Sequence, residues 1–207
     1  EIAKLTRLAQ PTIGVITNVG VAHIERLGSR EAIAAAKCEL LVEMPVTSTA
    51  ILNADNPLLM ETAANCWTGP IVTFGLTAGD LQGQLLDLQT LVVDGQTFHL
   101  PLPGEHNAVN FLAGLAVAQV LGIPWSRLTH LDLNLPDGRS QRYTLPNDIL
   151  LLDETYNAGP ESMTAALKLL MQTPGQRHLA VLGTMKELGY RSLAFHQEIG
   201  QLVKKLR

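Results

Sequence analysis

Short runs of apolar, often β-branched residues alternate along the chain with segments whose apolar residues recur every three or four positions. The runs predict buried strands at 12–19, 50–53, 71–74, 149–152 and 177–182. The helical spacing predicts helices over 1–10, 29–43, 58–66, 103–121, 124–130, 162–171 and 197–207. Strands that alternate with helices indicate a mostly parallel sheet covered on both faces. The pattern therefore predicts the α/β fold class.

Residues 81–102 follow a different pattern, in which apolar and polar positions alternate. This alternation predicts strands near 81–88, 90–93 and 97–101, with a turn at Asp94-Gly95. We expect these strands to form an antiparallel hairpin or sheet edge.

The polar stretch 131–142 contains Pro136 and Gly138 and separates two series of strands and helices. It is the best candidate for a linker or hinge. The sequence thus predicts two domains, residues 1–134 and residues 135–207.

Composition narrows the class of protein. The chain is 46% hydrophobic and 16% charged, which favours a folded core over disorder. A net charge of −4 without a basic run argues against nucleic-acid binding. No apolar stretch approaches the roughly 20 residues of a membrane span. Cys38 and Cys66 lack metal-ligand spacing, so we expect reduced thiols in a cytoplasmic protein.

The stretch 149–163 combines a predicted strand, a polar turn and a helix. The strand ends at Asp153 and Glu154, and Pro160 can occupy the first helical turn, where its missing N–H costs nothing. Parallel α/β proteins bind ligands at such carboxyl ends of strands. The same pattern also fits an ordinary βα turn.

Two further positions are candidates for metal chemistry. His23 and Glu25 follow the strand at 12–19 and could ligate a metal, although a loop histidine can also be a hydrogen-bonded surface residue. Lys37 lies on a helical stripe of apolar residues, where desolvation lowers the pKa of an amine. A free amine can react with carbon dioxide to give a carbamate, which is an anionic metal ligand. The alternative is a lysine whose ammonium group reaches solvent at the edge of the stripe.

Polar residues near the hinge are candidates for nucleotide binding. Asn107 and Asn110 share one face at the start of a helix and could contact a planar ring such as adenine. Alternatively, Asn107 caps the helix and Asn110 makes a buried polar contact. Arg139 offers a planar fork for phosphate, but it could also be a solvated linker residue. Asp153 could accept hydrogen bonds from ribose hydroxyls.

These residues occur in an order that resembles the Mur ligase family over essentially the whole chain. The first half contains 17–25 (TNVGVAHIE), 33–40 (IAAAKCEL) and 104–110 (GEHNAVN). The second half contains 153–163 (DETYNAGPESM) and 181–189 (VLGTMKELG). The second pair resembles the branch that adds D-alanyl-D-alanine to UDP-N-acetylmuramoyl-tripeptide. The resemblance implies a central ATPase domain followed by the start of a Rossmann-like C-terminal domain.

The resemblance implies an ATP-dependent amide ligase of peptidoglycan precursor synthesis. ATP phosphorylates the peptide carboxylate, and the amine of D-alanyl-D-alanine attacks the acyl phosphate. Because carboxylate is a poor electrophile, phosphorylation supplies a leaving group, and Mg²⁺ neutralises charge. His23 would be a magnesium ligand, and Lys37 a carbamylated lysine that helps hold a second magnesium ion.

The nucleotide site follows from the same resemblance. Asn107 and Asn110 would contact adenine, Arg139 the ATP phosphates and Asp153 the ribose. Tyr156 and Asn157 would line the side of the cleft that holds ATP and the incoming dipeptide. The resemblance also implies a monomeric parent protein.

The chain lacks the G-x-x-G-K-[ST] phosphate loop of the family. We therefore expect it to be an internal, catalytically inactive part of a longer ligase. Two rival interpretations stay open: another amide ligase of the Mur or folylpolyglutamate type, and a non-catalytic scaffold that lost the phosphate loop.

Overall fold

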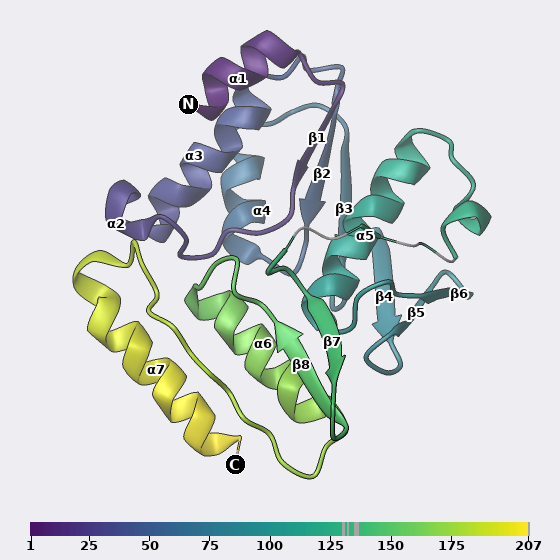
Figure 1. Cartoon of the computed structure of the whole chain (residues 1–207). Helices are drawn as coiled ribbons and strands as arrows, with labels where there is room; N and C mark the ends of the chain where they lie inside the picture. The colour runs from purple at the N-terminus through teal and green to yellow at the C-terminus, as the bar shows by residue number, and fades with distance from the viewer. Residues whose placement is uncertain (130, 132, 135–136, 207) are drawn as a thin grey trace. The chain divides into compact units, whose positions relative to one another are not determined.

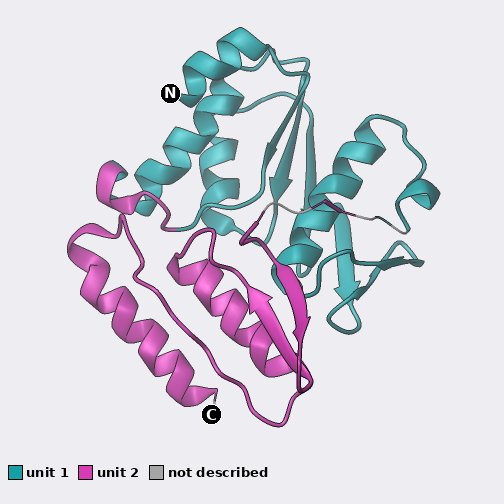
Figure 2. Cartoon of the chain, viewed as in Figure 1, with its two compact units in different colours: residues 1–20, 27–131 teal, residues 21–26, 132–207 magenta. Residues whose placement is uncertain are grey.

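The computed structural model describes residues 1–129, 131, 133–134 and 137–206. The chain divides into two compact units (Figures 1 and 2). Unit 1 comprises residues 1–20 and 27–131, and unit 2 comprises residues 21–26 and 132–207. The predicted boundary between residues 134 and 135 falls beside residues outside the described part, so it stays a prediction.

Unit 1 is built on a six-stranded sheet with the order β1-β2-β3-β4-β5-β6 (Figure 1). The strands are β1 Ile13–Ile16, β2 Thr49–Asn53, β3 Ile71–Gly75, β4 Leu81–Leu85, β5 Thr90–Val93 and β6 Gln96–His99. The pairs from β1 to β4 are parallel, and those from β4 to β6 are antiparallel. This mostly parallel α/β sheet confirms the predicted fold class and the antiparallel edge.

Helices cover both faces of the parallel strands, with α3 and α4 on one face and α5 on the other (Figure 1). The helices of unit 1 are α1 Ile2–Ala9, α3 Arg30–Glu43, α4 Pro57–Ala64, α5 Glu105–Val120 and the 3₁₀ helix η1 Trp125–Leu128, whereas the short helix α2 Ile24–Leu27 lies mostly in the segment 21–26 of unit 2. Because both faces of β2 are covered, Ala50, Ile51 and Leu52 are fully buried.

The core of unit 1 continues under the antiparallel strands. Phe74, Leu91, Phe98 and Leu112 all have 0% exposure, so α5 and strands β3 to β6 share one apolar cluster. Asp94 and Gly95 have positive φ angles of 48° and 75° and form the tight hairpin turn between β5 and β6. The sequence signal at this dipeptide is thereby confirmed.

Unit 2 contains an antiparallel hairpin and two longer helices. Its elements are β7 Gln141–Leu145, β8 Ile149–Asp153, α6 Pro160–Gln172, the 3₁₀ helix η2 Gly189–Arg191 and α7 Ser192–Lys205. Pro160 is in the first turn of α6, as predicted. Among the buried residues of this unit are Leu167, Leu169, Met185, Phe195 and Ile199.

Three sequence predictions are wrong in unit 2. The run 149–152 is a strand but not a buried one, because Ile149, Leu150 and Leu151 are 53%, 39% and 45% exposed. Its one strand partner, β7, is antiparallel, so the parallel sheet predicted for this half is absent from the described residues. The run 177–182 forms no strand, and Val181 is fully exposed. An apolar run becomes a strand only where a neighbouring edge supplies hydrogen-bonding partners.

The final helix also differs from its predicted bounds, because α7 begins at Ser192 rather than near Gln197. Across the described residues, no helix combines the length and apolarity needed to cross a membrane.

Candidate functional site

Helix α3 brings Lys37 to the carboxyl end of β1. The helix begins after Ser29, whose hydroxyl oxygen accepts a hydrogen bond from the Ala32 backbone at 3.1 Å. Ile33 and Leu41 are 2% and 1% exposed, which confirms the predicted apolar stripe. Lys37 is half-buried beside them, and its Nζ donates to the Asn18 carbonyl oxygen at 2.6 Å. The amine is therefore held at a strand end, where α/β proteins bind ligands.

His23 lies in the segment 21–26, which belongs to unit 2. Its backbone has φ 64°, and its Nδ1 forms a hydrogen bond with the Glu187 carboxylate. The Glu187 carbonyl oxygen accepts from the Glu25 backbone at 3.1 Å. Carboxylate contact at one imidazole nitrogen is the arrangement that orients a histidine toward a ligand at the other.

The predicted magnesium ligands, His23 and Lys37, meet only some of the requirements of a magnesium site. Within the described residues, no group of three or more His, Cys, Asp or Glu side chains could hold a metal ion. Mg²⁺ prefers oxygen ligands, whereas His23 offers a nitrogen and Lys37 offers oxygen only as a carbamate. The magnesium roles of these residues stay predictions.

The first two turns of α5 carry the two candidate adenine contacts. Asn107 donates from Nδ2 to the Pro103 carbonyl oxygen at 2.9 Å and makes no cap, because the N-cap residue is Gly104. Asn110 is exposed rather than buried. The alternative interpretation, a capping Asn107 and a buried Asn110, is therefore wrong, and the adenine role of both residues stays a prediction.

Arg139 and Tyr156 form a stacked pair in unit 2. The Arg139 guanidinium carbon lies 3.7 Å from the centre of the Tyr156 ring. The Tyr156 backbone donates to the Gly138 carbonyl oxygen at 2.9 Å. Gly138 has φ 73°, and a Cβ there would lie 2.9 Å from the Tyr156 nitrogen, so this turn requires glycine. Stacking uses the face of the guanidinium and leaves its N–H edge directed elsewhere.

Asp153 is the last residue of β8, and Asn157 directly follows Tyr156 in the turn after this strand. Hydrogen bonds from the Thr155 hydroxyl and backbone lower the pKa of Asp153, so this carboxylate is ionised at neutral pH and can accept from hydroxyl groups. Asn157 is exposed, and its Oδ1 accepts from the Ala158 backbone at 2.8 Å. Since Gln141 pairs with Asp153, the structure brings four predicted residues together at the open end of the hairpin: Arg139, Asp153, Tyr156 and Asn157.

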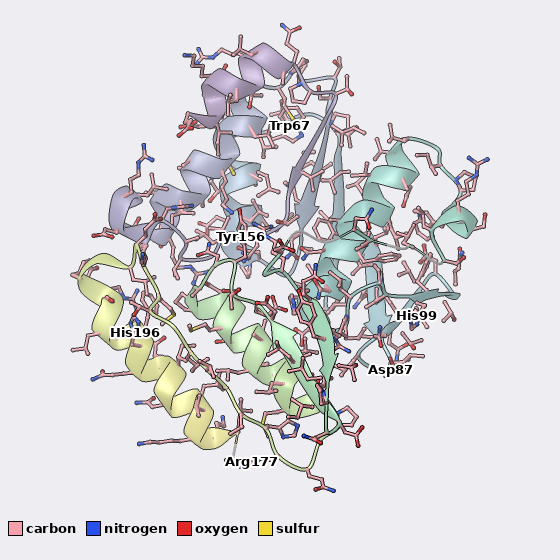
Figure 3. All side chains as sticks on the ribbon, viewed as in Figure 1. Trp67, Asp87, His99, Tyr156, Arg177 and His196 are labelled. Carbon is pink, nitrogen blue, oxygen red and sulfur yellow. The ribbon has the colours of Figure 1, made fainter. Side chains whose placement is uncertain are left out.

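Several other polar or reactive side chains make structural contacts. His196 on α7 accepts from the Met185 backbone at Nε2, and its Nδ1 lies 2.7 Å from the Ser192 carbonyl oxygen (Figure 3). Trp67 is 6% exposed and donates to the Pro70 carbonyl oxygen. Cys38 and Cys66 are free thiols. Burial, with a smaller contribution from Cys66, raises the pKa of Cys38 to about 12.

Sequence reasoning missed the contacts that support Lys37. Asn18, Asn53 and Asn56 form hydrogen bonds around the end of β1. Two asparagines three positions apart, directly after a predicted strand, are the sequence signal that could have identified them. Glu187, the partner of His23, lies 164 positions away and gives no local signal.

Comparison with known families and proteins matches both halves of the chain. Residues 1–118 match the Mur ligase middle domain, and residues 138–206 match the Mur ligase glutamate ligase domain. The whole chain is 56% identical to part of the UDP-N-acetylmuramoyl-tripeptide–D-alanyl-D-alanine ligase of Synechocystis sp., covering 45% of that protein.

Solved structures agree with this match. A crystal structure of MurF from Acinetobacter baumannii superposes with a TM-score of 0.89 at 29% identity, covering 99% of this chain and 47% of that one. MurF from Thermotoga maritima in complex with ADP gives 0.85 at 30% identity, covering 97% and 48%. The chain spans just under half the length of each relative. Because the middle-domain match alone covers more than half of its residues, the chain belongs to the Mur ligase family.

Proposed function

We propose that this chain is part of an ATP-dependent amide ligase that adds D-alanyl-D-alanine to UDP-N-acetylmuramoyl-tripeptide in peptidoglycan precursor synthesis. The observation that carries the proposal is the 56% identity, over every residue of the chain, to a ligase of that name. The ADP complex of the Thermotoga maritima relative supports use of an adenine nucleotide. A cytoplasmic location and a monomeric parent belong to the same proposal.

The residues at the open end of the β7–β8 hairpin bind the nucleotide. Arg139, held by its stack on Tyr156, directs its N–H edge to the ATP phosphates. The ionised Asp153 accepts from the ribose hydroxyls, and Asn157 lines the same cleft. Asn107 and Asn110 on α5 contact adenine.

Lys37 and His23 are the magnesium ligands in this proposal. Magnesium, when bound, neutralises charge on the transferring phosphoryl group. His23 contributes an imidazole nitrogen, and Lys37 contributes an oxygen ligand once its amine has formed a carbamate. Within the described residues, no group of three or more His, Cys, Asp or Glu side chains could hold a metal ion, so the proposal gives His23 and Lys37 only part of a magnesium coordination shell.

A chimera tests the proposal. The matching segment of the Synechocystis ligase is replaced by this chain, and ADP release is measured with UDP-N-acetylmuramoyl-tripeptide and different acceptor amines. We expect release that needs D-alanyl-D-alanine, with less than about a tenth of that rate for L-glutamate or diaminopimelate. A folded chimera that prefers another acceptor supports a different amide ligase, and one that releases no ADP supports the non-catalytic scaffold. The unaltered ligase and the isolated chain, expected to be active and inactive, are the controls.

A further inference from the structure

Side chains from other elements hold each carbonyl oxygen of residues 17–19, the three residues that follow β1. The Thr17 oxygen accepts from Asn53 Nδ2 at 2.9 Å, and the Asn18 oxygen accepts from Lys37 Nζ at 2.6 Å. The Val19 oxygen accepts from Asn56 Nδ2 at 3.2 Å and Arg30 Nη2 at 3.3 Å. All these residues lie in unit 1. The acceptor of Lys37 is therefore the middle one of three fixed carbonyls.

Two buried asparagines make this arrangement rigid. Asn53 and Asn56 are 6% and 7% exposed. Each uses Oδ1 within its own turn, where Asn53 accepts from the Asp55 backbone at 2.9 Å and Asn56 caps α4 through Leu59 at 3.1 Å. Each uses Nδ2 for the segment 17–19, and Asn56 also donates to Asn18 Oδ1 at 2.6 Å. Buried amides with every group paired have little freedom to move.

The turn that carries the asparagines is itself anchored. Asp55 accepts from the backbones of Leu76 at 2.6 Å, Thr77 at 3.0 Å and Ala78 at 3.0 Å, and from the Thr77 hydroxyl at 2.5 Å. Burial alone would raise the pKa of Asp55, but these hydrogen bonds lower it below its ordinary value. Asp55 thus ties the turn to the end of β3, while the asparagines tie the same turn, at the end of β2, to the segment that follows β1.

We propose that Asn53 and Asn56 are positioning residues for Lys37: they fix the Asn18 carbonyl and thereby the direction of Lys37 Nζ. This inference rests on the proposed function, in which that nitrogen becomes a carbamate. The neutral amine attacks the carbon of carbon dioxide: an N–C bond forms as one C=O π bond breaks, its electron pair moves to oxygen, and one proton leaves the nitrogen to water. The remaining N–H donates to the Asn18 oxygen, so the new carboxylate points away from that carbonyl.

The chain offers a matched pair of substitutions. Asn53→Asp keeps the volume and the acceptor for the Asp55 backbone but loses the donor to Thr17. Asn65→Asp makes the same chemical change at an exposed asparagine, whose Nδ2 donates to the Glu61 carbonyl oxygen at 3.0 Å. If Asn53→Asp fails to fold, Asn56→Ser replaces it, because serine keeps the cap and removes the Nδ2 donor.

The first measurement needs no enzymatic activity. The 207-residue chain is acylated with limiting acetic anhydride, and mass spectrometry compares modification of Lys37 with that of the exposed Lys4. We expect Asn53→Asp to raise the relative labelling of Lys37 at least about fivefold, because its acceptor is no longer fixed. Equal labelling in Asn53→Asp, Asn65→Asp and the unaltered chain would overturn the proposal.

The second measurement uses the chimera with the Synechocystis ligase. We expect Asn53→Asp to lower kcat about tenfold while KM for D-alanyl-D-alanine changes less than about twofold, and Asn65→Asp to change neither. If the chimera is inactive in every variant, the proposed function is contradicted. The labelling of Lys37 then still tests whether Asn53 and Asn56 position this lysine. An active chimera in which the two aspartate variants behave alike overturns the inference only.

Discussion

Strands β2 and β8 have similar sequences but different surroundings. Both are short apolar runs that end in a polar residue, Asn53 and Asp153. Residues 50–52 of β2 are fully buried, whereas residues 149–151 of β8 are 39% to 53% exposed. The first run has a parallel strand on each side and helices on both faces, while the second has one strand partner in the described residues. Both of these apolar runs form strands, and their neighbours determine how deeply each strand is buried.

Truncation of one leucine in each strand gives the largest expected difference. Leu52→Ala leaves a cavity and should lower the free energy of unfolding of unit 1 by about 2–5 kcal/mol. Leu151→Ala removes a half-exposed side chain and should cost unit 2 less than about 1 kcal/mol.

The intrinsic signals of tryptophan and tyrosine report on the unfolding of each unit in this experiment. Both tryptophans, Trp67 and Trp125, lie in unit 1, and all three tyrosines, Tyr143, Tyr156 and Tyr190, lie in unit 2. Urea unfolding is therefore followed by tryptophan fluorescence and by tyrosine second-derivative absorbance. Similar losses of unfolding free energy in Leu52→Ala and Leu151→Ala would contradict the difference in burial between β2 and β8.

Hydrogen–deuterium exchange of backbone amides should also distinguish β2 from β8. The amides of β2 pair within a six-stranded sheet, and those of β8 pair within a hairpin. We expect β2 amides to exchange with deuterium at least about tenfold more slowly than β8 amides. Equal protection, measured by NMR at single residues, would mean that β8 is as well supported as β2.

A smaller effect is expected at the exposed site of unit 2. In the chimera, Tyr156→Leu removes the ring beneath Arg139 and should raise KM for ATP about 2- to 5-fold. Tyr156→Phe keeps the ring and should leave KM unchanged. If Phe and Leu variants have the same KM, stacking does not position the arginine.

The smallest effect concerns the buried thiol of unit 1. The pKa of Cys38 rises from an ordinary value of 9.0 to about 12, so the folded state keeps the neutral thiol where the unfolded state ionises. Stability is therefore unaffected below about pH 9 and falls as pH rises toward 12. Cys38→Ala should reduce this alkaline loss, measured as urea midpoints at pH 8 and 10 by tryptophan fluorescence. An identical loss in the variant would show that Cys38 does not cause it.

The sequence predicted most of unit 1 because its signals are local. The turn at Asp94-Gly95 and the apolar face around Lys37 depend on neighbours within a few positions. The exposure of β8 and the missing strand at 177–182 depend on partners that a pattern along the chain does not specify.

Only part of the candidate site could be predicted, because many of its contacts join residues that are far apart in the sequence. Family motifs identified Arg139 and Tyr156, but the stack between them appears only once the hairpin brings positions 17 apart into contact. The asparagines at positions 53 and 56 are 36 and 38 positions from their partners, so the local signal at these positions does not specify which residues they contact.

Oxygen tracing tests the central claim most directly. The chimera is supplied with ATP, D-alanyl-D-alanine and UDP-N-acetylmuramoyl-tripeptide in which both oxygens of the terminal carboxylate are ¹⁸O. The isotopic composition of the released phosphate is measured by mass spectrometry. If the chain belongs to a ligase that acts through an acyl phosphate, each phosphate carries one ¹⁸O from the peptide. Amide formation with unlabelled phosphate would contradict the account.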